Sequence, residues 1–388
     1  MILIMSRWLI ILNKGMRGNN KIMNKEEPKF KLFGKTKKGS ERTLHLFGIK
    51  IKYKKEKKKE EPRFKLFGKT KKGSKRTLHI FGLKIKYKKK VKDDIDKKEI
   101  QKQINEFKEA GITKEKRHPK LIVSLTSFPQ RMHDIHFALY SLLNQTLKPD
   151  ELVLWLADTE FPNKEDDLPL SVLSLKNNGL TIKWCKNTYS YKKLIPALKE
   201  FPNDVIVTAD DDVYYPSNWL ELLYNAHLKE PQYIHCHIAA RPTFDKNKNI
   251  SNYTEWIPCV NNIEPSFCNF LTGAGGVLYP LKALYKDVLD EELFLKLSPT
   301  NDDIWFWAMA VLNNKKINLI NNIVKLRCIN IERELGTYDE LVLSHNNVEG
   351  GDHHKQLKNI FNHYPNLKKI VEYDNSNDNP HDCQKTEN

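Results

Sequence analysis

The feature that most constrains the fold is an alternation of short apolar segments with helical segments between residues 120 and 208. Strands are predicted at residues 120–124, 151–156, 180–185 and 204–208, and helices at 134–145, 167–177 and 191–200. Strands that alternate with helices in this way favour a parallel, doubly wound α/β sheet with helices on both faces. Because ligands bind at the carboxyl ends of the strands in such sheets, functional side chains are expected there.

The net positive charge of the chain lies in its first third. The formal net charge is +17, but residues 1–119 contain 38 Lys and Arg against 13 Asp and Glu, whereas the remainder contains 27 against 35. A basic composition spread over a whole domain would suggest nucleic acid as a partner. Because the predicted α/β region is mildly acidic instead, no nucleic-acid partner is expected.

A tandem duplication accounts for most of this basic region, at residues 26–90. The stretch from Glu26 to Lys55 recurs almost unchanged from Glu60 to Lys89, at an offset of 34 residues. Apolar and lysine side chains alternate at residues 49–53, which is compatible with a hairpin in each copy. Two copies are too few for a self-supporting solenoid, so loose or induced order is expected. Two interpretations stay open. The region is either an anchor for an anionic membrane surface, with Lys and Arg at the headgroups and Phe and Leu inserted, or a solvated extension with no partner.

The other segments outside the α/β region carry weaker signals. Residues 1–25 contain neither a full apolar span nor a small-residue cleavage site, which argues against a transmembrane helix and against a signal peptide. They are expected to be a leader or a mis-assigned start before a true start at Met23. Residues 91–119 are expected to form a linker with helical character, and residues 371–388 a disordered C-terminal tail. The six cysteines form no CxxC pair, which argues against a disulfide scaffold or structural zinc and favours a reducing, cytoplasmic compartment.

Three consecutive carboxylates, Asp210, Asp211 and Asp212, follow the strand predicted at residues 204–208. Adjacent carboxylates repel one another, so a fold that keeps them together at a strand end supplies a cation or leaves them in solvent. Mg²⁺ and Mn²⁺ take such hard oxygen ligands, and Mg²⁺ usually binds through one or two carboxylates plus substrate phosphates. The triplet therefore predicts a divalent-metal site, with a solvated acidic turn before the next helix as the alternative.

An ordered set of motifs resembles the GT-A fold glycosyltransferases, in particular a bacterial branch similar to family 2. The set lies within residues 120–364 and consists of SFPxR from Ser127, SLLxQT from Ser141, PD at Pro149, SYKKL from Ser190, segment 208–215, segment 271–280 with its glycines, and DDxW from Asp302. The resemblance implies a GT-A fold, which is Rossmann-like with a mixed, mostly parallel sheet flanked by helices, over residues 120–370. The Gln-x-x-Arg-Trp motif of processive polymer synthases is missing, which implies an enzyme that adds single sugars.

The resemblance also implies how a nucleotide-sugar donor is bound. Thr126 and Ser127 would lie beside its base and ribose. Asp210 would bind the ribose, and Asp212, with Asp210 as a further ligand, would hold Mn²⁺ or Mg²⁺ against the two phosphates. Asp211 would support them. The metal would stabilise the negative charge that develops on the leaving diphosphate.

Four further residues are implied as donor contacts. Arg131 and Lys193 would contact phosphate, although exposed cations on a helix face are an equal alternative. The backbone at Gly275 and Gly276 would approach the sugar or phosphate closely, because glycine has no side chain to obstruct it. The alternative for the two glycines is a tight turn into a strand at residues 277–279.

The acidic pair at residues 302–303 opens a predicted apolar helix at residues 304–312. The resemblance implies that Asp303, or alternatively Asp302, deprotonates the acceptor hydroxyl, although one of the two could simply cap the helix. The implied reaction is a direct displacement with inversion, which transfers a sugar to a glycan or lipid-linked acceptor. The implied setting is bacterial surface polysaccharide or lipooligosaccharide synthesis at the inner face of the plasma membrane.

A non-catalytic protein is the rival interpretation, with a degenerate GT-A domain that recognises carbohydrate and a tail that docks on lipid or nucleic acid. The presence of both acidic groups, at residues 210–212 and 302–303, favours the enzyme. Histidines give a further alternative, because His345, His353 or His354 could complete the metal shell. The sequence His235-Cys236-His237 has strand alternation, so packing or polar pairing is expected there rather than metal binding.

Overall fold

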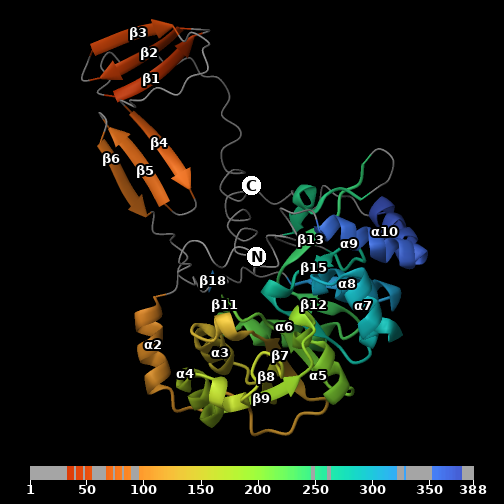
Figure 1. Ribbon diagram of the computed structural model, residues 1–388. Coiled ribbons are helices and arrows are strands. Elements are labelled where there is room, and N and C mark those ends of the chain that lie inside the picture. Colours follow the sequence, from red (N-terminus) through yellow and green to blue (C-terminus); the bar gives the residue numbers. More distant parts are fainter. Residues whose placement is uncertain are drawn as a thin grey trace. The chain divides into compact units, whose positions relative to one another are not determined.

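The computed structural model describes residues 96–245, 250–259, 264–320 and 352–377, together with the backbone of short strands between residues 33 and 88 and at residues 327–328 (Figure 1). The chain divides into two compact units. One unit, Ile11–Lys92, contains the tandem repeat, and the other contains the α/β region.

Each copy of the repeat forms a three-stranded antiparallel sheet. In the first copy β2 (Glu41–Leu46) lies between β1 (Phe33–Lys38) and β3 (Ile49–Lys54), and in the second β5 (Lys75–Ile80) lies between β4 (Phe67–Lys72) and β6 (Leu83–Lys88). The two sheets have the same register, since Phe33 pairs with Leu46 and Phe67 with Ile80. In the sequence, two residues, one of them glycine, lie between successive strands of each copy. Each copy therefore has one strand more than the predicted hairpin.

A seven-stranded sheet forms the centre of the α/β unit and confirms the predicted fold class. Its order is β17-β12-β16-β10-β7-β8-β9, and of these seven strands only β16 runs antiparallel to its neighbours. The strands are β7 (Leu121–Thr126), β8 (Glu151–Ala157), β9 (Leu180–Cys185), β10 (Val205–Thr208), β12 (Ile234–Cys236), β16 (Val277–Tyr279) and β17 (Ile317–Leu319). All four strands predicted between residues 120 and 208 are present.

In β7, β8, β10 and β16, alternating side chains pack into two separate hydrophobic layers, as the two-residue period of a strand requires. In β7, Leu121, Val123 and Leu125 join one layer and Ile122 joins the other. The first layer is covered by α2 (Lys97–Glu106), α3 (Ile135–Leu143), α4 (Leu170–Leu173) and α6 (Trp219–Lys229). The second is covered by α5 (Ile195–Glu200), α7 (Glu291–Leu297), α8 (Asp302–Leu312), α9 (Asp352–His363) and α10 (Pro365–Asn377).

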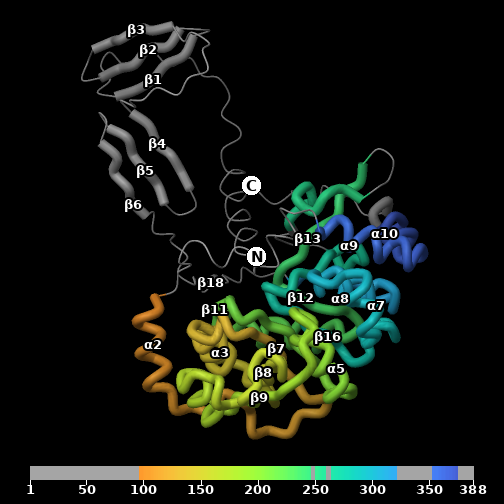
Figure 2. Tube along the Cα trace, in the orientation of Figure 1, coloured from red at the N-terminus to blue at the C-terminus, as the bar shows by residue number. Residues whose placement is uncertain are grey.

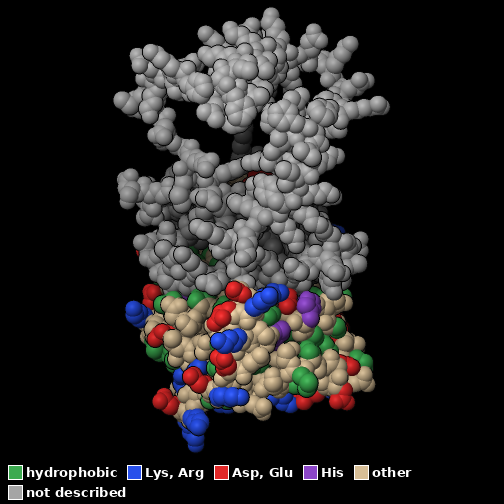
Figure 3. Space-filling view, turned by 90° about the vertical axis from the view of Figure 1, so that its left-hand side faces the viewer, with side chains coloured by type: hydrophobic (Ala, Val, Ile, Leu, Met, Phe, Trp, Pro, Cys, Tyr) green, Lys and Arg blue, Asp and Glu red, His purple; other side chains and the backbone are tan. Residues whose placement is uncertain are grey.

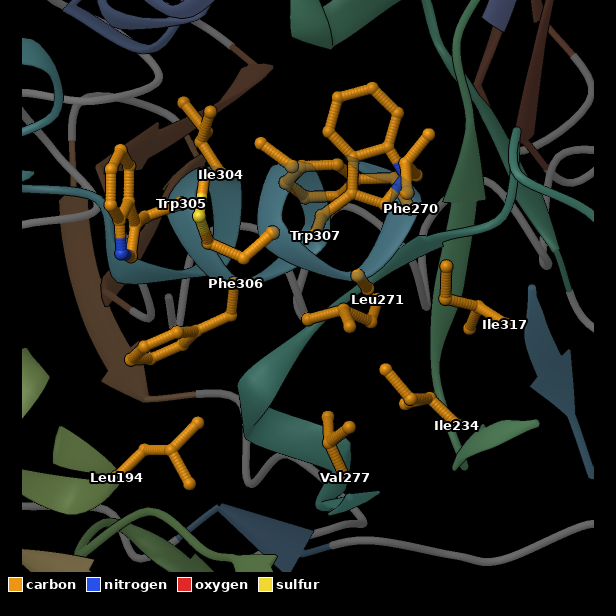
Figure 4. Close-up of a cluster of buried hydrophobic side chains, with 14 of the residues drawn as sticks. Leu194, Ile234, Phe270, Leu271, Val277, Ile304, Trp305, Phe306, Trp307 and Ile317 are labelled. Atoms are coloured by element: carbon orange, nitrogen blue, oxygen red, sulfur yellow. The ribbon is translucent and has the colours of Figure 1, made fainter. Parts of the chain in front are cut away.

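Helix α8 carries the largest side chains of the second layer. Figure 4 shows Trp305, Phe306 and Trp307 of this helix among side chains from the neighbouring strands, with Phe306 directed towards Leu194. All three aromatic side chains are fully buried. Burying an apolar side chain of this size stabilises a protein by roughly 1.5–3 kcal/mol, so α8 is firmly fixed against the sheet. The first residues of α8 are the acidic pair at 302–303.

Smaller pairings flank the central sheet. A three-stranded sheet has β13 (Ala239–Arg241) between β14 (Ile257–Cys259) and β15 (Phe270–Leu271). The short strand β11 (Val213–Tyr214), directly after the acidic triplet, pairs with β18 (Arg327–Cys328).

Two predicted helices are shorter and more broken than expected. Residues 167–177 form α4 followed by the 3-10 turn Ser174–Asn178, which ends at Gly179 with a φ of 107°. Residues 191–200 form the 3-10 turn Tyr189–Lys193 and then α5, which has Pro196 in its first turn. Proline is tolerated in the first turn of a helix but not in its interior, which explains why α5 begins where it does.

The α/β unit extends beyond the predicted boundaries of residues 120–370 at both ends. Helix α2, expected as part of a linker, buries Ile100 and Ile104 in the first layer, and Lys97 Nζ lies 2.7 Å from Asp134 Oδ2. At the other end, α10 (Figure 2) continues past residue 371 to Asn377. Val371 is buried. The carboxylate of Asp374 accepts hydrogen bonds from the Ser266 hydroxyl and the backbone N–H of residue 267. The first residues of the predicted disordered tail are therefore helical.

The charged side chains and the cysteines of the α/β unit match what its composition leads one to expect. On the face shown in Figure 3, acidic and basic side chains are interspersed. Cys185, Cys236 and Cys268 are in the thiol form. Within the described ranges, no helix has the length and apolar character to cross a lipid bilayer.

Candidate active site

The acidic triplet follows β10 at the carboxyl ends of the parallel strands, as predicted. The backbone N–H of Asp210 donates to Tyr215 Oη at 2.8 Å, and Tyr215 Oη donates to the carbonyl of Ala274 at 3.3 Å. The N–H of Tyr215 donates in turn to Ser141 Oγ of α3 at 3.1 Å. A buried tyrosine thus fixes the turn that carries the carboxylates against both α3 and the 3-10 turn Gly273–Gly275.

The last two carboxylates of the triplet form a cluster with Arg131, here called the Arg131 cluster: Ser127, Arg131, Asp211 and Asp212. Ser127 Oγ donates to Asp211 Oδ2 at 2.5 Å. Arg131 Nη1 lies 3.0 Å from Asp212 Oδ2 and 3.9 Å from Asp211 Oδ1. The second oxygen of Asp212, Oδ1, is buried and has no hydrogen-bond partner among the described residues.

The first carboxylate of the triplet belongs to a different cluster, here called the Lys193 cluster: Lys193, Asp210, Gly273, Asp302 and Asp303. Lys193 Nζ lies 3.0 Å from Asp210 Oδ1 and 3.1 Å from Asp302 Oδ2. The backbone N–H of Gly273 donates to both carboxylate oxygens of Asp303, each at 3.1 Å. One buried ammonium therefore joins the triplet to the acidic pair that the sequence places about ninety residues later.

The closeness of these charged groups favours glycine at position 273. A Cβ atom there would lie 2.7 Å from Lys193 Nζ and 2.8 Å from Asp303 Oδ1. Real Cβ atoms do not approach heavy atoms so closely, so any other residue would displace the cluster. The sequence identified this glycine only as part of a longer motif.

The acidic pair occupies the first turn of α8, but neither residue caps the helix. Asn301 is the N-cap, and its Oδ1 accepts a hydrogen bond from the N–H of Ile304 at 3.2 Å. Both aspartates are therefore free of the capping role that the sequence left open. Negative charge is also favourable in the first turn of a helix, because the backbone N–H groups there are positive.

Burial and like charge set the protonation of the site. Burial raises the pKa of Asp303 to about 7 against the opposing charge of Lys193, with Asp302 adding to the rise. Burial also raises the pKa of Asp211 to about 6, opposed by Arg131. Burial alone would lower the pKa values of Lys193 and Arg131, but the adjacent carboxylates raise both above their ordinary values. The two cations therefore stay charged among five carboxylates, which leaves an excess of negative charge.

Residues outside the predicted set hold the loop before α8. Gln356 of α9 accepts hydrogen bonds from Ser298 Oγ and the N–H of Thr300, and donates to Thr300 Oγ1. Tyr191 Oη donates to the carbonyl of Ser298 at 2.6 Å. No local sequence pattern predicts the role of Gln356, because its partners lie 56 and 58 residues away in the chain.

Three residues predicted to contact the nucleotide-sugar donor, namely Thr126, Gly275 and Gly276, are packed against other parts of the protein. Thr126 Oγ1 donates to the carbonyl of Trp155 in β8 at 2.8 Å. A Cβ at position 275 would meet Ile238, and one at position 276 would lie 2.3 Å from the Trp219 ring. Gly276 also has a φ of 89°, a conformation that favours glycine. Packing alone accounts for Gly275 and Gly276, and their contact with substrate stays a prediction.

Of the histidines considered as metal ligands, His353 packs among aromatic side chains, and the role of His354 stays a prediction. The His353 ring is buried against Tyr253, Trp256 and Phe270, with centroid distances of 4.3, 5.2 and 5.6 Å. His345 lies outside the described residues. His235 is buried and pairs with the carbonyl of Glu230, which confirms the expectation of polar pairing.

The acidic groups fit a divalent ion only if substrate supplies some of its ligands. Within the described ranges, no three His, Cys, Asp or Glu side chains are arranged to hold a metal by themselves. The unpartnered Oδ1 of Asp212 and the surplus of carboxylates are suited to an ion that takes one or two protein oxygens and completes its shell with phosphate oxygens and water. A cage made wholly of protein ligands does not fit.

Comparisons with known proteins give no family assignment. No protein-family model and no curated protein matches the sequence. Among solved structures, the chain is similar to S. aureus TarS 1–349 in complex with UDP, with 15% identity and a TM-score of 0.35, covering 53% of this chain and 59% of that chain. The chain thus spans less than two thirds of that structure.

Two further solved structures are similar at the same level. The first, also of S. aureus TarS 1–349, has 14% identity and a TM-score of 0.37, covering 63% of this chain and 72% of that chain. The second, the inositol-1-phosphate CTP transferase from T. maritima, has 12% identity and a TM-score of 0.34, covering 58% and 95%. Since all three TM-scores are below 0.5, no function is inferred from these structures.

Proposed function

We propose that this protein is a glycosyltransferase that uses a nucleotide-sugar donor and a divalent metal ion. The observation that carries the proposal is the meeting of the two acidic groups, at residues 210–212 and 302–303, around the buried Lys193 at the carboxyl ends of the parallel strands. A purely structural role would not bring five carboxylates together with only two cations, because burying unpaired charge is costly. A reaction that transfers a sugar from a diphosphate to a hydroxyl uses such an arrangement, because negative charge develops on the diphosphate and the hydroxyl loses a proton.

The proposed roles follow from which carboxylates remain available. Asp212, with Asp210 as its partner, would hold Mn²⁺ or Mg²⁺, which when bound would stabilise the leaving nucleoside diphosphate. Ser127 and Thr126 would lie beside the nucleoside. Asp303 is the proposed general base, because its raised pKa of about 7 is well matched to accepting a proton near neutral pH. Asp302, paired with Lys193, would keep the base in place.

The acceptor is proposed to be a hydroxyl of a glycan or glycolipid, with inversion at the anomeric carbon and one sugar added per encounter. A role in bacterial surface polysaccharide or lipooligosaccharide synthesis follows from the motif resemblance and the basic repeat region together. Nucleotide base, donor sugar and linkage are to be identified by experiment. A thermal-shift screen of UDP, GDP and CDP with Mn²⁺ is the first step, because a ligand that binds the folded state raises its melting temperature.

Isosteric variants test the catalytic assignment. Asp212→Asn and Asp303→Asn should each reduce sugar transfer by about 1,000-fold or more while leaving the melting temperature close to wild type. Excess chelator should abolish wild-type transfer. Glu165→Gln, which breaks an exposed ion pair with Lys176, is the matched control and should keep full activity. Full activity in either site variant, or in chelator, would show that the assigned role is wrong, and donor binding without any transfer would favour the non-catalytic alternative.

The basic repeat region is proposed to bind an anionic membrane surface. Each Lys or Arg near such a surface contributes about 1 kcal/mol, so the full-length protein should sediment with vesicles containing phosphatidylserine and dissociate in high salt. A truncated protein beginning at Asp93, which keeps α2 on its domain, should stay in the supernatant. Equal sedimentation of the two proteins would exclude the repeats as the anchor.

A further inference from the structure

Arg131 lies where a metal ion on Asp212 would have to compete with it. Its guanidinium contacts Asp212 Oδ2 at 3.0 Å and approaches Asp211 Oδ1 to 3.9 Å, and its side chain is only 13% exposed. The ring of Phe128 lies on another side, 5.6 Å from the guanidinium carbon. The donor-free protein therefore already has a positive charge beside Asp212, the main carboxylate proposed to bind metal.

A metal ion on Asp212 and the guanidinium of Arg131 would repel each other strongly. The interaction between charges grows as the local dielectric falls, and the side chains of Arg131, Asp211 and Asp212 are only 13%, 12% and 5% exposed. Of the four carboxylate oxygens of Asp211 and Asp212, Asp212 Oδ1 is the one with no partner among the described residues. A metal ion arriving alone would find one open oxygen beside a fixed positive charge, which is a weak site.

We propose that Arg131 is a resident counter-ion that keeps the metal site weak until a nucleoside diphosphate arrives, and that it then exchanges Asp212 for a phosphate oxygen. This inference rests on the proposed function, because it needs a metal and a diphosphate at this site. The two arriving groups balance the exchange. The diphosphate brings the negative charge that Arg131 needs, and the metal supplies the positive charge that Asp212 loses.

The chemistry and placement of Arg131 suit such an exchange. Its planar guanidinium binds carboxylate and phosphate with the same fork of N–H donors, so it can change partners without changing charge. Arg131 belongs to the short 3-10 turn Pro129–Arg131 that follows β7. Lys193 differs, because it is held between two carboxylates on separate elements and lies over the bare backbone of Gly273.

The inference predicts a coupling between metal and nucleotide that depends on Arg131. The affinity for Mn²⁺ is measured on the full-length protein from the electron paramagnetic resonance signal of free Mn²⁺, with and without UDP or GDP. Wild type should bind Mn²⁺ weakly alone and at least tenfold more tightly with the nucleotide that the protein accepts. Arg131→Met should bind Mn²⁺ alone at least tenfold more tightly than wild type and gain less from nucleotide.

Lys120→Met is the matched control, because it removes a different cation–carboxylate pair, Lys120 with Glu151, at the opposite end of β7. It should match wild type throughout. If Arg131→Met fails to fold, the gain in Mn²⁺ affinity that nucleotide gives wild type still tests the idea, and its absence would overturn it. If Arg131→Met binds Mn²⁺ no more tightly than wild type while wild type binds it with nucleotide, the exchange is wrong and the metal site stands. If no protein binds Mn²⁺ under any condition, the proposed metal site fails as well.

Discussion

The two halves of the acidic site use the same chemistry, an aspartate pair with one cation, but differ in how completely they are closed. In the Arg131 cluster, one carboxylate oxygen of Asp212 is unpartnered among the described residues, and the cation comes from a short turn. In the Lys193 cluster, the ammonium is shared between Asp210 and Asp302, and Gly273 closes over it. The first arrangement is suited to exchanging ligands and the second to holding a base in one position.

The difference also shows what a run of identical residues can do at a strand end. Asp210 turns towards Lys193, whereas Asp211 and Asp212 turn towards Arg131. A single loop can therefore supply carboxylates both to the Arg131 cluster, on the proposed donor side, and to the Lys193 cluster, on the proposed acceptor side. The following predictions test whether the two halves are as different as their geometry indicates.

The largest effect is expected from removing the cation of the closed half. Lys193→Met would leave Asp210 and Asp302 buried without their counter-ion, which typically costs about 3–5 kcal/mol of unfolding free energy. Arg131→Met should cost less, because Asp211 keeps the hydroxyl of Ser127. Urea unfolding of both variants at pH 8 measures the difference. Equal losses would show that the Lys193 cluster is not the more tightly built half.

A smaller change should damage the closed half without removing any charge. Gly273→Ala places a methyl group against Lys193 and Asp303 and should reduce sugar transfer by about 100-fold, because a displacement near 1 Å of a catalytic group has effects of that order. Gly111→Ala is the control. It introduces a similar clash with Leu143, away from the acidic residues, and should change stability but not turnover. Comparable activity in the two variants would contradict a positional role for Gly273.

The smallest effect is a pH dependence of the closed half. Asp303 must be ionised to accept a proton, and its pKa is raised to about 7 by burial, so kcat/KM should rise with pH and level off above about pH 7. Below that value the rate should fall about tenfold per pH unit. Initial rates between pH 5 and 9 at saturating metal give the profile. A rate that is flat across this range, or that falls as pH rises, would argue against Asp303 as the base.

The sequence predicted the central strands well, because each is a short apolar run between polar segments. The bounds of β9 and the position of the triplet after β10 agree with the prediction. Helices with a proline or a glycine-ended turn, such as those around Pro196 and Gly179, were predicted as longer than they are. Local sequence signals do not show how such breaks are resolved once the segment packs against the sheet.

The sequence predicted which residues make up the candidate site but not how their side chains are arranged. The residue types and their position at the strand ends were identified, since they depend on local sequence and on the fold class. The opposite directions of Asp210 and Asp211, the shared Lys193 and the support from Gln356 depend on contacts between distant elements. A single sequence does not encode these contacts in any local pattern.

The proposed function depends on a metal ion that is bound by the carboxylates at residues 210–212 and that in turn binds a diphosphate. A crystal structure with Mn²⁺ and the nucleoside diphosphate that most raises the melting temperature tests this directly. We expect an anomalous signal from manganese bonded to Asp212 Oδ1 and to a phosphate oxygen, with Asp303 in the same site. Manganese and diphosphate bound elsewhere, with Asp212 still paired to Arg131, would contradict it.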